Sequence, residues 1–368
     1  MKRVFVRTGC GLDISKNDFH ACFGGQDTEG NFVIRARKKF KNQPSGINAY
    51  LAWLDKQRSK LSGQGELPFQ AVMETTGIYH ENLLFAAYEA GLPVCLELAK
   101  KVKRYLHSIG QESKTDKLDA AGICQMSCER RCKRWEPFSP NIYSLRAALR
   151  HRKSLIKAKT RFSNQLHAMR HSRVADKEVK ASVERLLKQT EKEIKKAEHR
   201  IMELYQADTC LSSQLQPIVE SIKGLGLFTA LTVAAETNGF AQITSRKQLA
   251  SYAGYDVLEN SSGDVTKKGR MSKRGNARIR AAMYMSAVCV IRFKEGPLYE
   301  LFARVRRRNP KVYKIANVAV QRKLLLLIYT LFKKGEAFDP LKYGEFENKH
   351  IDGSSEPSPE LREIETAG

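Results

Sequence analysis

The sequence of 368 residues has no apolar run that approaches the ~20 residues needed to cross a bilayer. Its strongest apolar stretch, Leu324–Ile328, predicts a buried helix instead. The chain starts Met1-Lys2-Arg3 and continues with only a brief apolar run, so no secretory signal is expected. The eight cysteines show neither a disulfide framework nor a complete zinc ligand set. These absences predict a cytoplasmic protein without a membrane partner.

Negative charge is also scarce. Lys and Arg number 64 against 39 Asp and Glu, for a net charge of +25. From Arg146 to Arg173 there are nine Lys or Arg and no acid. This surplus predicts a polyanionic partner, and nucleic acid is favoured because no amphipathic membrane helix or lipid-anchor motif stands out. A basic soluble protein without such a partner is the alternative. The candidate phosphate contacts in this segment are Arg150, Arg152, Lys153 and Lys157.

Four carboxylates stand out by their positions. Asp116 and Asp119 lie three residues apart, so a helix there would present both on one face. Asp13 follows one apolar run and Glu74 ends another. An unpaired charge at the end of a buried strand is costly. The presence of these acids is explained if the four of them meet around divalent cations. Such carboxylates favour Mg²⁺, with Mn²⁺ as a substitute, and two ions can clamp an in-line phosphoryl displacement.

The first third of the chain predicts an α/β domain. Strands are expected at 4–14, 19–23, 32–40, 69–74 and 93–98, with helices from 44 to 61, after 77, and through about 131. The order βββαβαβα is that of an RNase H-like, or RuvC-like, fold, expected over residues 1–137. Its first strand is central, so Asp13 can meet Glu74, and a later helix brings Asp116 and Asp119.

Residues 138–214 predict a basic helical or coiled-coil linker. Apolar residues from Val183 to Leu204 alternate in spacings of four and three, which is a heptad pattern. Two explanations stay open at this point. The helix packs inside its own domain, or it forms a coiled coil used for assembly.

Residues 215–343 predict a mostly helical domain, and 344–368 a disordered tail. The segment Ile222–Ala230 indicates a helix-hairpin-helix-like turn in which Gly224 and Gly226 let backbone N–H groups approach phosphate. Ser262 precedes a glycine and lies in an expected basic loop, with seven Lys or Arg between residues 267 and 280. The candidate nucleic-acid contacts there are Lys267, Lys268, Arg270, Lys273 and Arg274. A serine hydroxyl can attack phosphorus when positive charge stabilises the product, although Ser-Ser-Gly is usually only a turn.

The motifs together resemble the insertion-sequence-110 family of transposases, which includes the Piv-type DNA invertases. In the first half these are Gly11–Lys16, Met73–Tyr79 and Lys114–Ala120, similar to the family's DEDD signature on a RuvC-like domain. In the second half they are Ile222–Gly226, Ala253–Gly254, Ser262–Gly263 and Arg270–Asn276. One difference is that the usual proline after Ala-Gly is missing, since Tyr255-Asp256-Val257 follows.

The resemblance implies a transposase or site-specific recombinase. It makes Asp13, Glu74, Asp116 and Asp119 the metal-binding acids, and Ser262 the nucleophile of a covalent phosphoserine link, with Ser261 as the alternative. It further implies double-stranded donor and target DNA, a noncoding guide RNA called a bridge RNA, a dimer or tetramer, and a bacterial or archaeal protein at the nucleoid. The alternative function is a RuvC-like structure-specific endonuclease that attacks with water.

Overall fold

The computed structural model describes residues 3–342 except 62, 64, 76, 114, 242, 263–264 and 309. The chain divides into two compact units, Met1–Pro137 and Phe138–Gly368, and each has its own hydrophobic core. The boundary expected between residues 214 and 215 lies inside the second unit, where residues from both sides share one core. The expected tail, 344–368, lies outside the described residues.

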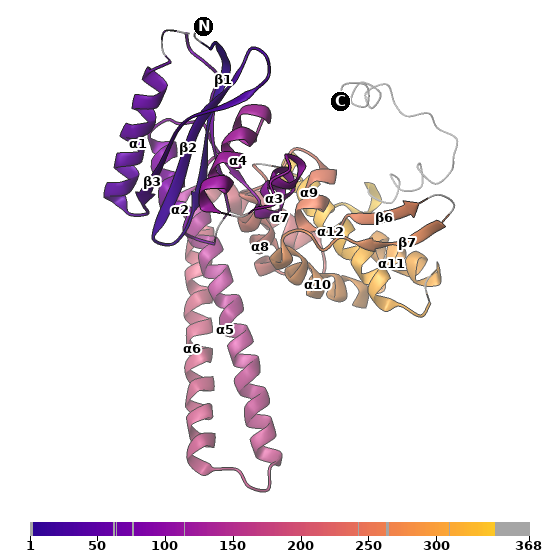
Figure 1. Ribbon diagram of the computed structural model, residues 1–368. Coiled ribbons are helices and arrows are strands. Elements are labelled where there is room, and N and C mark those ends of the chain that lie inside the picture. Colours follow the sequence, from indigo (N-terminus) through magenta and orange to yellow (C-terminus); the bar gives the residue numbers. More distant parts are fainter. Residues whose placement is uncertain are drawn as a thin grey trace, which may run out of the picture. The chain divides into compact units, whose positions relative to one another are not determined.

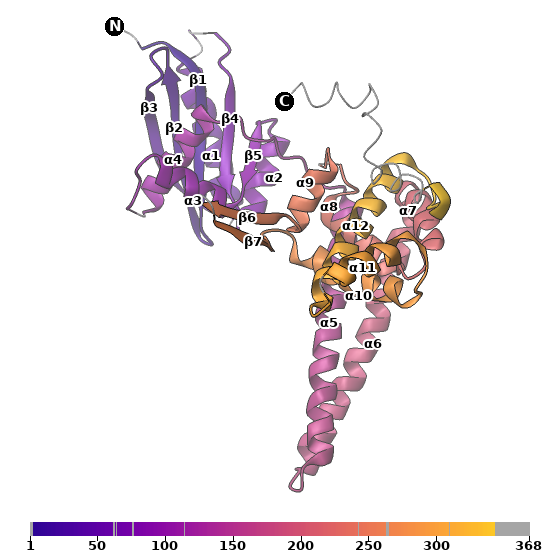
Figure 2. The same cartoon turned by 90° about the vertical axis from the view of Figure 1, so that its right-hand side faces the viewer.

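The first unit is built on one five-stranded sheet in the order β3-β2-β1-β4-β5 (Figure 2). The central strand, β1, runs antiparallel to β2 and parallel to β4. At the two edges, β3 is antiparallel to β2 and β5 is parallel to β4. This order and these directions are those of an RNase H-like fold, so the predicted fold of the N-terminal region is confirmed. The strands are β1 (Phe5–Ile14), β2 (Asp18–Asp27), β3 (Phe32–Lys41), β4 (Phe69–Glu74) and β5 (Val94–Glu97).

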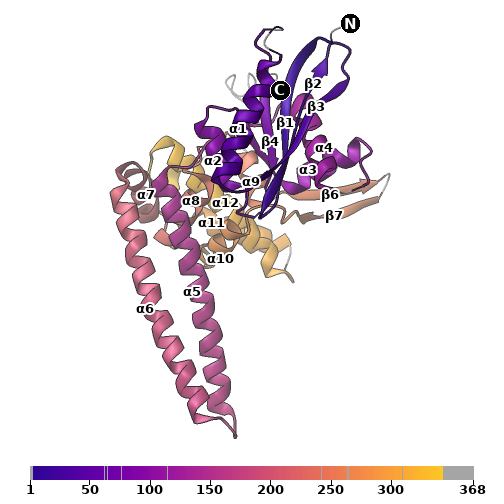
Figure 3. The same cartoon turned by 60° about the vertical axis from the view of Figure 1, so that its left-hand side comes forward.

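Helices cover both faces of this sheet (Figure 3). α1 (Pro44–Ser59) and α2 (Glu81–Glu89) bury one face, with the Tyr50 and Leu54 side chains against Leu12 of β1. α3 (Ala99–Ser108) and α4 (Asp116–Glu129) cover the other face. There α4 lies directly on the glycines of β1, since a Cβ added to Gly11 would fall 2.1 Å from the backbone nitrogen of Cys124. Only glycine permits this close approach.

The second unit begins with two long helices, α5 (Pro140–His171) and α6 (Lys177–Ala207), which lie side by side and antiparallel (Figure 1). Salt bridges cross between them, Arg152 to Glu198 at 2.6 Å and Lys159 to Glu191 at 2.9 Å. The heptad seam of α6 is largely buried here, with Val183 only 4% exposed. Of the two explanations for the seam, packing within its own domain is therefore the one observed, because α5 occupies it.

One core joins the bases of these helices to the rest of the second unit. The expected basic loop around Ser262 is wrong, because the backbone there forms a two-stranded antiparallel sheet in which Ser262 pairs with Val265. The remaining elements are α7 (Thr209–Ser221), α8 (Leu227–Thr237), α9 (Arg246–Ala253), β6 (Val257–Ser262), β7 (Val265–Met271), α10 (Ala277–Arg292), α11 (Gly296–Arg308) and α12 (Tyr313–Lys334).

The apolar segment predicted as a buried helix belongs to α12, which is longer than expected. Among the described residues, α12 is the one helix long and apolar enough to span a bilayer by length and composition. Its apolar side chains are instead the centre of the second unit's core, and Val320, Leu324 and Ile328 are fully buried. The expected buried helix is confirmed, while the expectation that no segment approaches membrane-spanning length is corrected.

Candidate active site and nucleic-acid interface

Two of the predicted acids lie at the ends of neighbouring strands. β1 and β4 are parallel, and the pairing of Leu12 with Met73 makes Asp13 and Glu74 the next residues on each strand. Side chains alternate along a strand, so Asp13 lies on the same face as Gly11, which α4 covers. Glu74 lies on that face too, because the same alternation places it with Val72, which packs in the α3–α4 core. Both acids are half-buried.

The first turn of α4 brings the other two acids toward the same end. A Cβ at Gly9 would meet Ser127, whereas one at Gly11 would meet Ala120, so α4 runs antiparallel to β1. Its N-terminus therefore lies beyond Gly11, toward Asp13. Thr115 caps the helix, its hydroxyl oxygen accepting the N–H of Leu118 at 3.3 Å. The register and packing thus gather four carboxylates on one face, at one end of the sheet.

Two polar side chains lie beside α4's acids. His20 is the cross-strand partner of Asp13, and its Nδ1 lies 3.7 Å from a carboxylate oxygen of Asp116. Gln111 donates from Nε2 to Oδ1 of Asp119 at 2.7 Å. Sequence reasoning singled out neither residue, because no spacing links them to the acids.

A fifth carboxylate belongs to the same face. Glu97 ends β5 as the register partner of Glu74, is 8% exposed, and pairs with Lys101 of α3 at 2.6 Å. It was missed although it carries the signal that identified Asp13 and Glu74, an acid that ends an apolar strand. Its partner Lys101 explains how this charge is tolerated without a metal.

The donor chemistry of this end of the sheet fits a divalent cation, since carboxylate oxygens are the ligands that Mg²⁺ prefers. Across the described residues, however, no three His, Cys, Asp or Glu side chains are already arranged as a ligand set. Asp116 is 66% exposed. Binding an ion here therefore requires the carboxylates to converge from positions that the backbone has already brought to one edge.

The predicted nucleophile lies on β6, in the second unit. Its backbone position is the last residue of the strand, at the tip of the β6–β7 hairpin. The side chains of residues 258–270 lie outside the described part, so the side-chain positions of Ser261, Ser262, Lys267, Lys268 and Arg270 are not described. Lys273 and Arg274 are described and exposed.

The base of this hairpin is clamped by its backbone. Asn276 donates its N–H to the carbonyl of Tyr252 at 2.7 Å, and Lys273 donates to that of Gly254 at 3.1 Å. A Cβ on Gly275 would lie 2.4 Å from the nitrogen of Gly254, so the two glycines are required for the chains to cross. Arg280 locks the crossing by donating to a carbonyl at 2.7 Å. The Ala-Gly and Arg-Gly-Asn motifs are therefore parts of one clamp.

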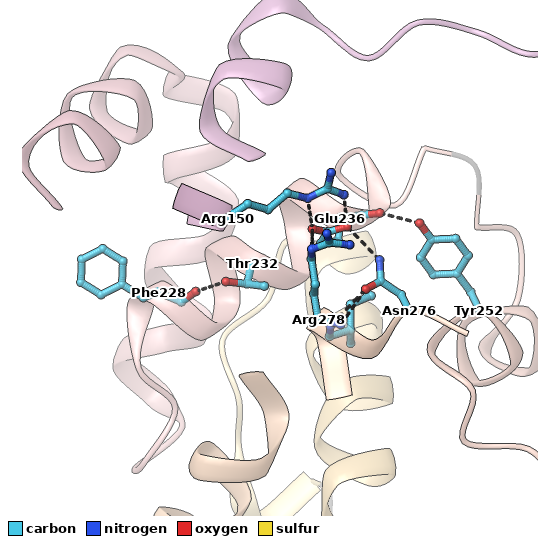
Figure 4. A network of polar contacts seen from close by, with 8 residues as sticks. Arg150, Phe228, Thr232, Glu236, Tyr252, Asn276 and Arg278 are labelled. Atoms are coloured by element: carbon cyan, nitrogen blue, oxygen red, sulfur yellow. Dashed lines mark hydrogen bonds and ion pairs between the residues drawn. The ribbon is translucent and has the colours of Figure 1, made fainter. Parts of the chain in front are cut away.

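A buried carboxylate joins this clamp to α5 (Figure 4). Glu236 of α8 is 3% exposed and accepts two hydrogen bonds from Arg150, each 2.8 Å. Asn276 donates from Nδ2 at 2.8 Å to Oε2, the oxygen that also accepts from Arg150 Nη2, and the Tyr252 hydroxyl donates to the backbone carbonyl of Glu236 at 2.8 Å. Burial would raise the pKa of Glu236, but the hydrogen bonds from Arg150 and Asn276 and the nearby Arg278 outweigh it and hold the pKa below its usual value.

A basic groove of about 620 Å³ runs beside this network, between α5, α8 and α10. Lys153 and Lys157 line it with exposed side chains, as the prediction of phosphate contacts requires. Arg150 and Arg152 line it as well, but each is also held by an acid, and Arg152 lies over the ring of Phe228 at 4.0 Å. Lys153 and Lys157 are consequently the stronger candidates for a phosphate.

The glycines of the predicted helix-hairpin-helix turn have a packing role. Gly224 has φ +90°, and a Cβ there would lie 2.8 Å from the backbone nitrogen of Val290 in α10. Gly226 is the N-cap of α8. The turn therefore joins α7 to α8 against α10, and phosphate binding by its backbone stays a prediction.

Comparison with known proteins agrees with these motifs. A DEDD-type, IS110 model described as a transposase matches residues 10–170, and the model "Transposase IS116/IS110/IS902 family" matches residues 216–302. The two together span well over half of the sequence. The chain belongs to the IS110 family of transposases.

The individual relatives have low sequence identity to this chain. The chain is 26% identical to the pilin gene-inverting proteins of Moraxella bovis and Moraxella lacunata over 338 residues, 90% of this chain and 98% of each relative. The match to a solved structure of Thermus thermophilus RuvC with a Holliday junction substrate spans 32% of this chain and 90% of the RuvC chain, at 15% identity and TM-score 0.23. The fold assignment therefore depends on strand order rather than on that superposition.

Proposed function

We propose that this transposase cuts and rejoins DNA through a covalent link to Ser262, supported by divalent cations on the four carboxylates. The observation that carries the proposal is that strand register and helix packing bring Asp13, Glu74, Asp116 and Asp119 to one face at one end of the sheet. Asp13 and Glu74 lie at the ends of neighbouring strands, Asp116 and Asp119 lie in the first turn of α4, and carboxylate oxygens are the ligands that Mg²⁺ prefers.

The chemistry is an exchange of esters. The Ser262 hydroxyl attacks phosphorus, a phosphoserine bond forms, and the bond from phosphorus to a deoxyribose oxygen breaks. The proton lost by the serine ends on the departing deoxyribose hydroxyl. Attack by the hydroxyl of another strand reverses the step and releases the serine. Because one ester replaces another, strands can be rejoined without an outside energy source.

Each part of the chain has a distinct task. Asp13, Glu74, Asp116 and Asp119 would hold Mg²⁺, which when bound stabilises the charge that develops at phosphorus. His20 and Gln111 orient the two acids of α4. The hairpin clamp presents Ser262 at the tip of β6, while Lys153 and Lys157 attract the phosphate backbone into the groove.

The partners follow from the same proposal. The substrate is double-stranded donor and target DNA, and a noncoding guide RNA pairs with both. A dimer or tetramer is expected from the family, although the α6 seam is occupied within the chain and does not indicate one. The large positive charge supports polyanionic partners in general.

The test is a covalent-adduct assay. Purified protein, guide RNA transcribed from the DNA flanking the gene, Mg²⁺ and end-labelled junction DNA are mixed and then denatured. We expect a protein–DNA adduct that disappears in Ser262→Ala and persists in Ser261→Ala. An adduct that persists in Ser262→Ala and disappears in Ser261→Ala would move the nucleophile by one residue. Nicked DNA without an adduct would refute the serine mechanism and favour a water-attacking, RuvC-like endonuclease.

A further inference from the structure

The polar network around Glu236 joins three elements that are distant in sequence. Glu236 lies on α8, Arg150 on α5, and Asn276 between β7 and α10. Nothing in the proposed chemistry uses Glu236. Burying a carboxylate in an apolar helix is costly, and Glu236 is only 3% exposed. Its presence is therefore best explained by a task that an apolar residue could not perform.

We infer that Glu236 is the positioning residue of the Ser262 hairpin, an inference that rests on the proposed serine chemistry. The hairpin projects from a base at which Tyr252 and Asn276 are joined, and both hydrogen-bond to Glu236. The carboxylate is in turn fixed by two parallel hydrogen bonds from Arg150, a geometry that sets direction as well as distance. Movement of the hairpin base would break these contacts together.

Asn276 performs two tasks at once. Its Oδ1 caps α10 by accepting the N–H of Arg278 at 2.9 Å, and its Nδ2 donates to Glu236. The end of the hairpin is thereby fixed to the start of α10, which lines the basic groove. A nucleic-acid backbone that binds Lys153 in the groove therefore meets the same rigid frame that carries the serine.

The neighbouring ion pair provides a matched control. Arg152 stands two residues from Arg150 on α5, lines the same groove, and donates two hydrogen bonds to Glu198 at 2.9 and 2.6 Å. Glu198 lies on α6 and has no contact with the hairpin base in any described interaction. The Glu198 side chain is more exposed than that of Glu236, at 34% against 4%, and Glu198→Gln thus removes an Arg–Glu pair of the same helix without releasing the hairpin.

The experiment compares Glu236→Gln with Glu198→Gln in single-turnover adduct formation with full-length protein, guide RNA and junction DNA. Glutamine keeps the shape of the side chain, and Arg150, which is 38% exposed, keeps contact with water. We expect the rate constant at saturating DNA to fall roughly tenfold to a hundredfold in Glu236→Gln, since a small misplacement of a reacting group has that effect. The DNA concentration for half-maximal rate should stay within about twofold, and Glu198→Gln should match wild type.

Rate constant and amplitude separate positioning from stability. A variant that only unfolds in part gives a smaller amplitude with an unchanged rate constant. Asn276→Ser is the second variant, because serine still caps α10 but is too short to reach Glu236. It should slow the rate constant as Glu236→Gln does. Wild-type rate constants in both variants, or a loss of amplitude alone, would overturn the inference. Absence of a Ser262-dependent adduct in wild type would instead overturn the proposed function itself.

Discussion

Because α4 lies against the backbone of β1, one added methyl group at Gly11 should displace the helix. In Gly11→Ala, the added Cβ would lie 2.1 Å from the Cys124 nitrogen and 2.3 Å from the Ala120 oxygen, both backbone atoms. An ordinary contact is at least 3.4 Å, so α4 must retreat by about 1.3 Å, the difference between these distances. Overpacking of this kind costs about 1–3 kcal/mol of unfolding free energy.

The same displacement moves two of the acids proposed to bind metal. Asp116 and Asp119 are on the first turn of α4, whereas Asp13 stays on β1. A shift of about 1 Å in such a constellation can reduce a rate about a hundredfold. We therefore expect Gly11→Ala to lower both the thermal midpoint, by roughly 3–10 °C, and the rate constant of adduct formation.

Gly63→Ala is the control, since an added Cβ there meets nothing within 4 Å. Thermal unfolding and single-turnover adduct formation are measured for both variants below the midpoint. A Gly11→Ala protein with the wild-type midpoint would show that α4 adapts without cost. A lowered midpoint with an unchanged rate constant would refute the link between the position of α4 and the proposed metal-binding acids.

Three other outcomes are expected. Asp116→Asn should raise the Mg²⁺ concentration needed for half-maximal adduct formation, and an unchanged titration would argue against a metal role. Lys153→Ala and Lys157→Ala should each reduce the slope of log affinity against log salt by about 1 in DNA binding, while an unaltered slope would exclude the groove as a backbone contact. The pKa of Glu236 is lowered in the folded protein, so its contribution to stability is present above its unfolded pKa and lost as pH falls through the folded one. Glu236→Gln should accordingly flatten the acid limb of the stability curve, and an identical limb in the variant would contradict that contribution.

The sheet of the first unit was predictable because its signals are local. β4 has the predicted bounds, and Asp13 and Glu74 were both expected at strand ends. The order of the strands then fixes which ends are neighbours. His20 was not predictable in this way, because its nearness to Asp116 comes from the register of β1 with β2 and from the packing of α4.

The second unit was less predictable because its site depends on contacts between distant segments. The hairpin was expected as a loop, although Gly263-Asp264 between Val257–Ser262 and Val265–Met271 is a hairpin signal. Glu236 carried a signal as well, as a lone acid in the apolar helix Leu227–Thr237, but its partners are 40 and 86 residues away. From the sequence, the basic residues of α5 were equivalent candidates for phosphate contacts. In the structure, Arg150 and Arg152 are each paired with an acid.

The helical pair α5–α6 has a consequence for local stability. On α5 the shared core ends at Leu149, and on α6 it begins at Ile201. Beyond Lys157, the last α5 residue that lines the groove with α8 and α10, the helix continues to His171 for roughly 21 Å with α6 as its packing partner. Two helices alone shield little backbone from water, so amide protons near Leu166 and Val183 should exchange with deuterium through local opening, well before those of α12. We expect amide exchange to be slow at the base of the helical pair and fast near its turn. A ligand that binds the turn would slow exchange there and remove this gradient.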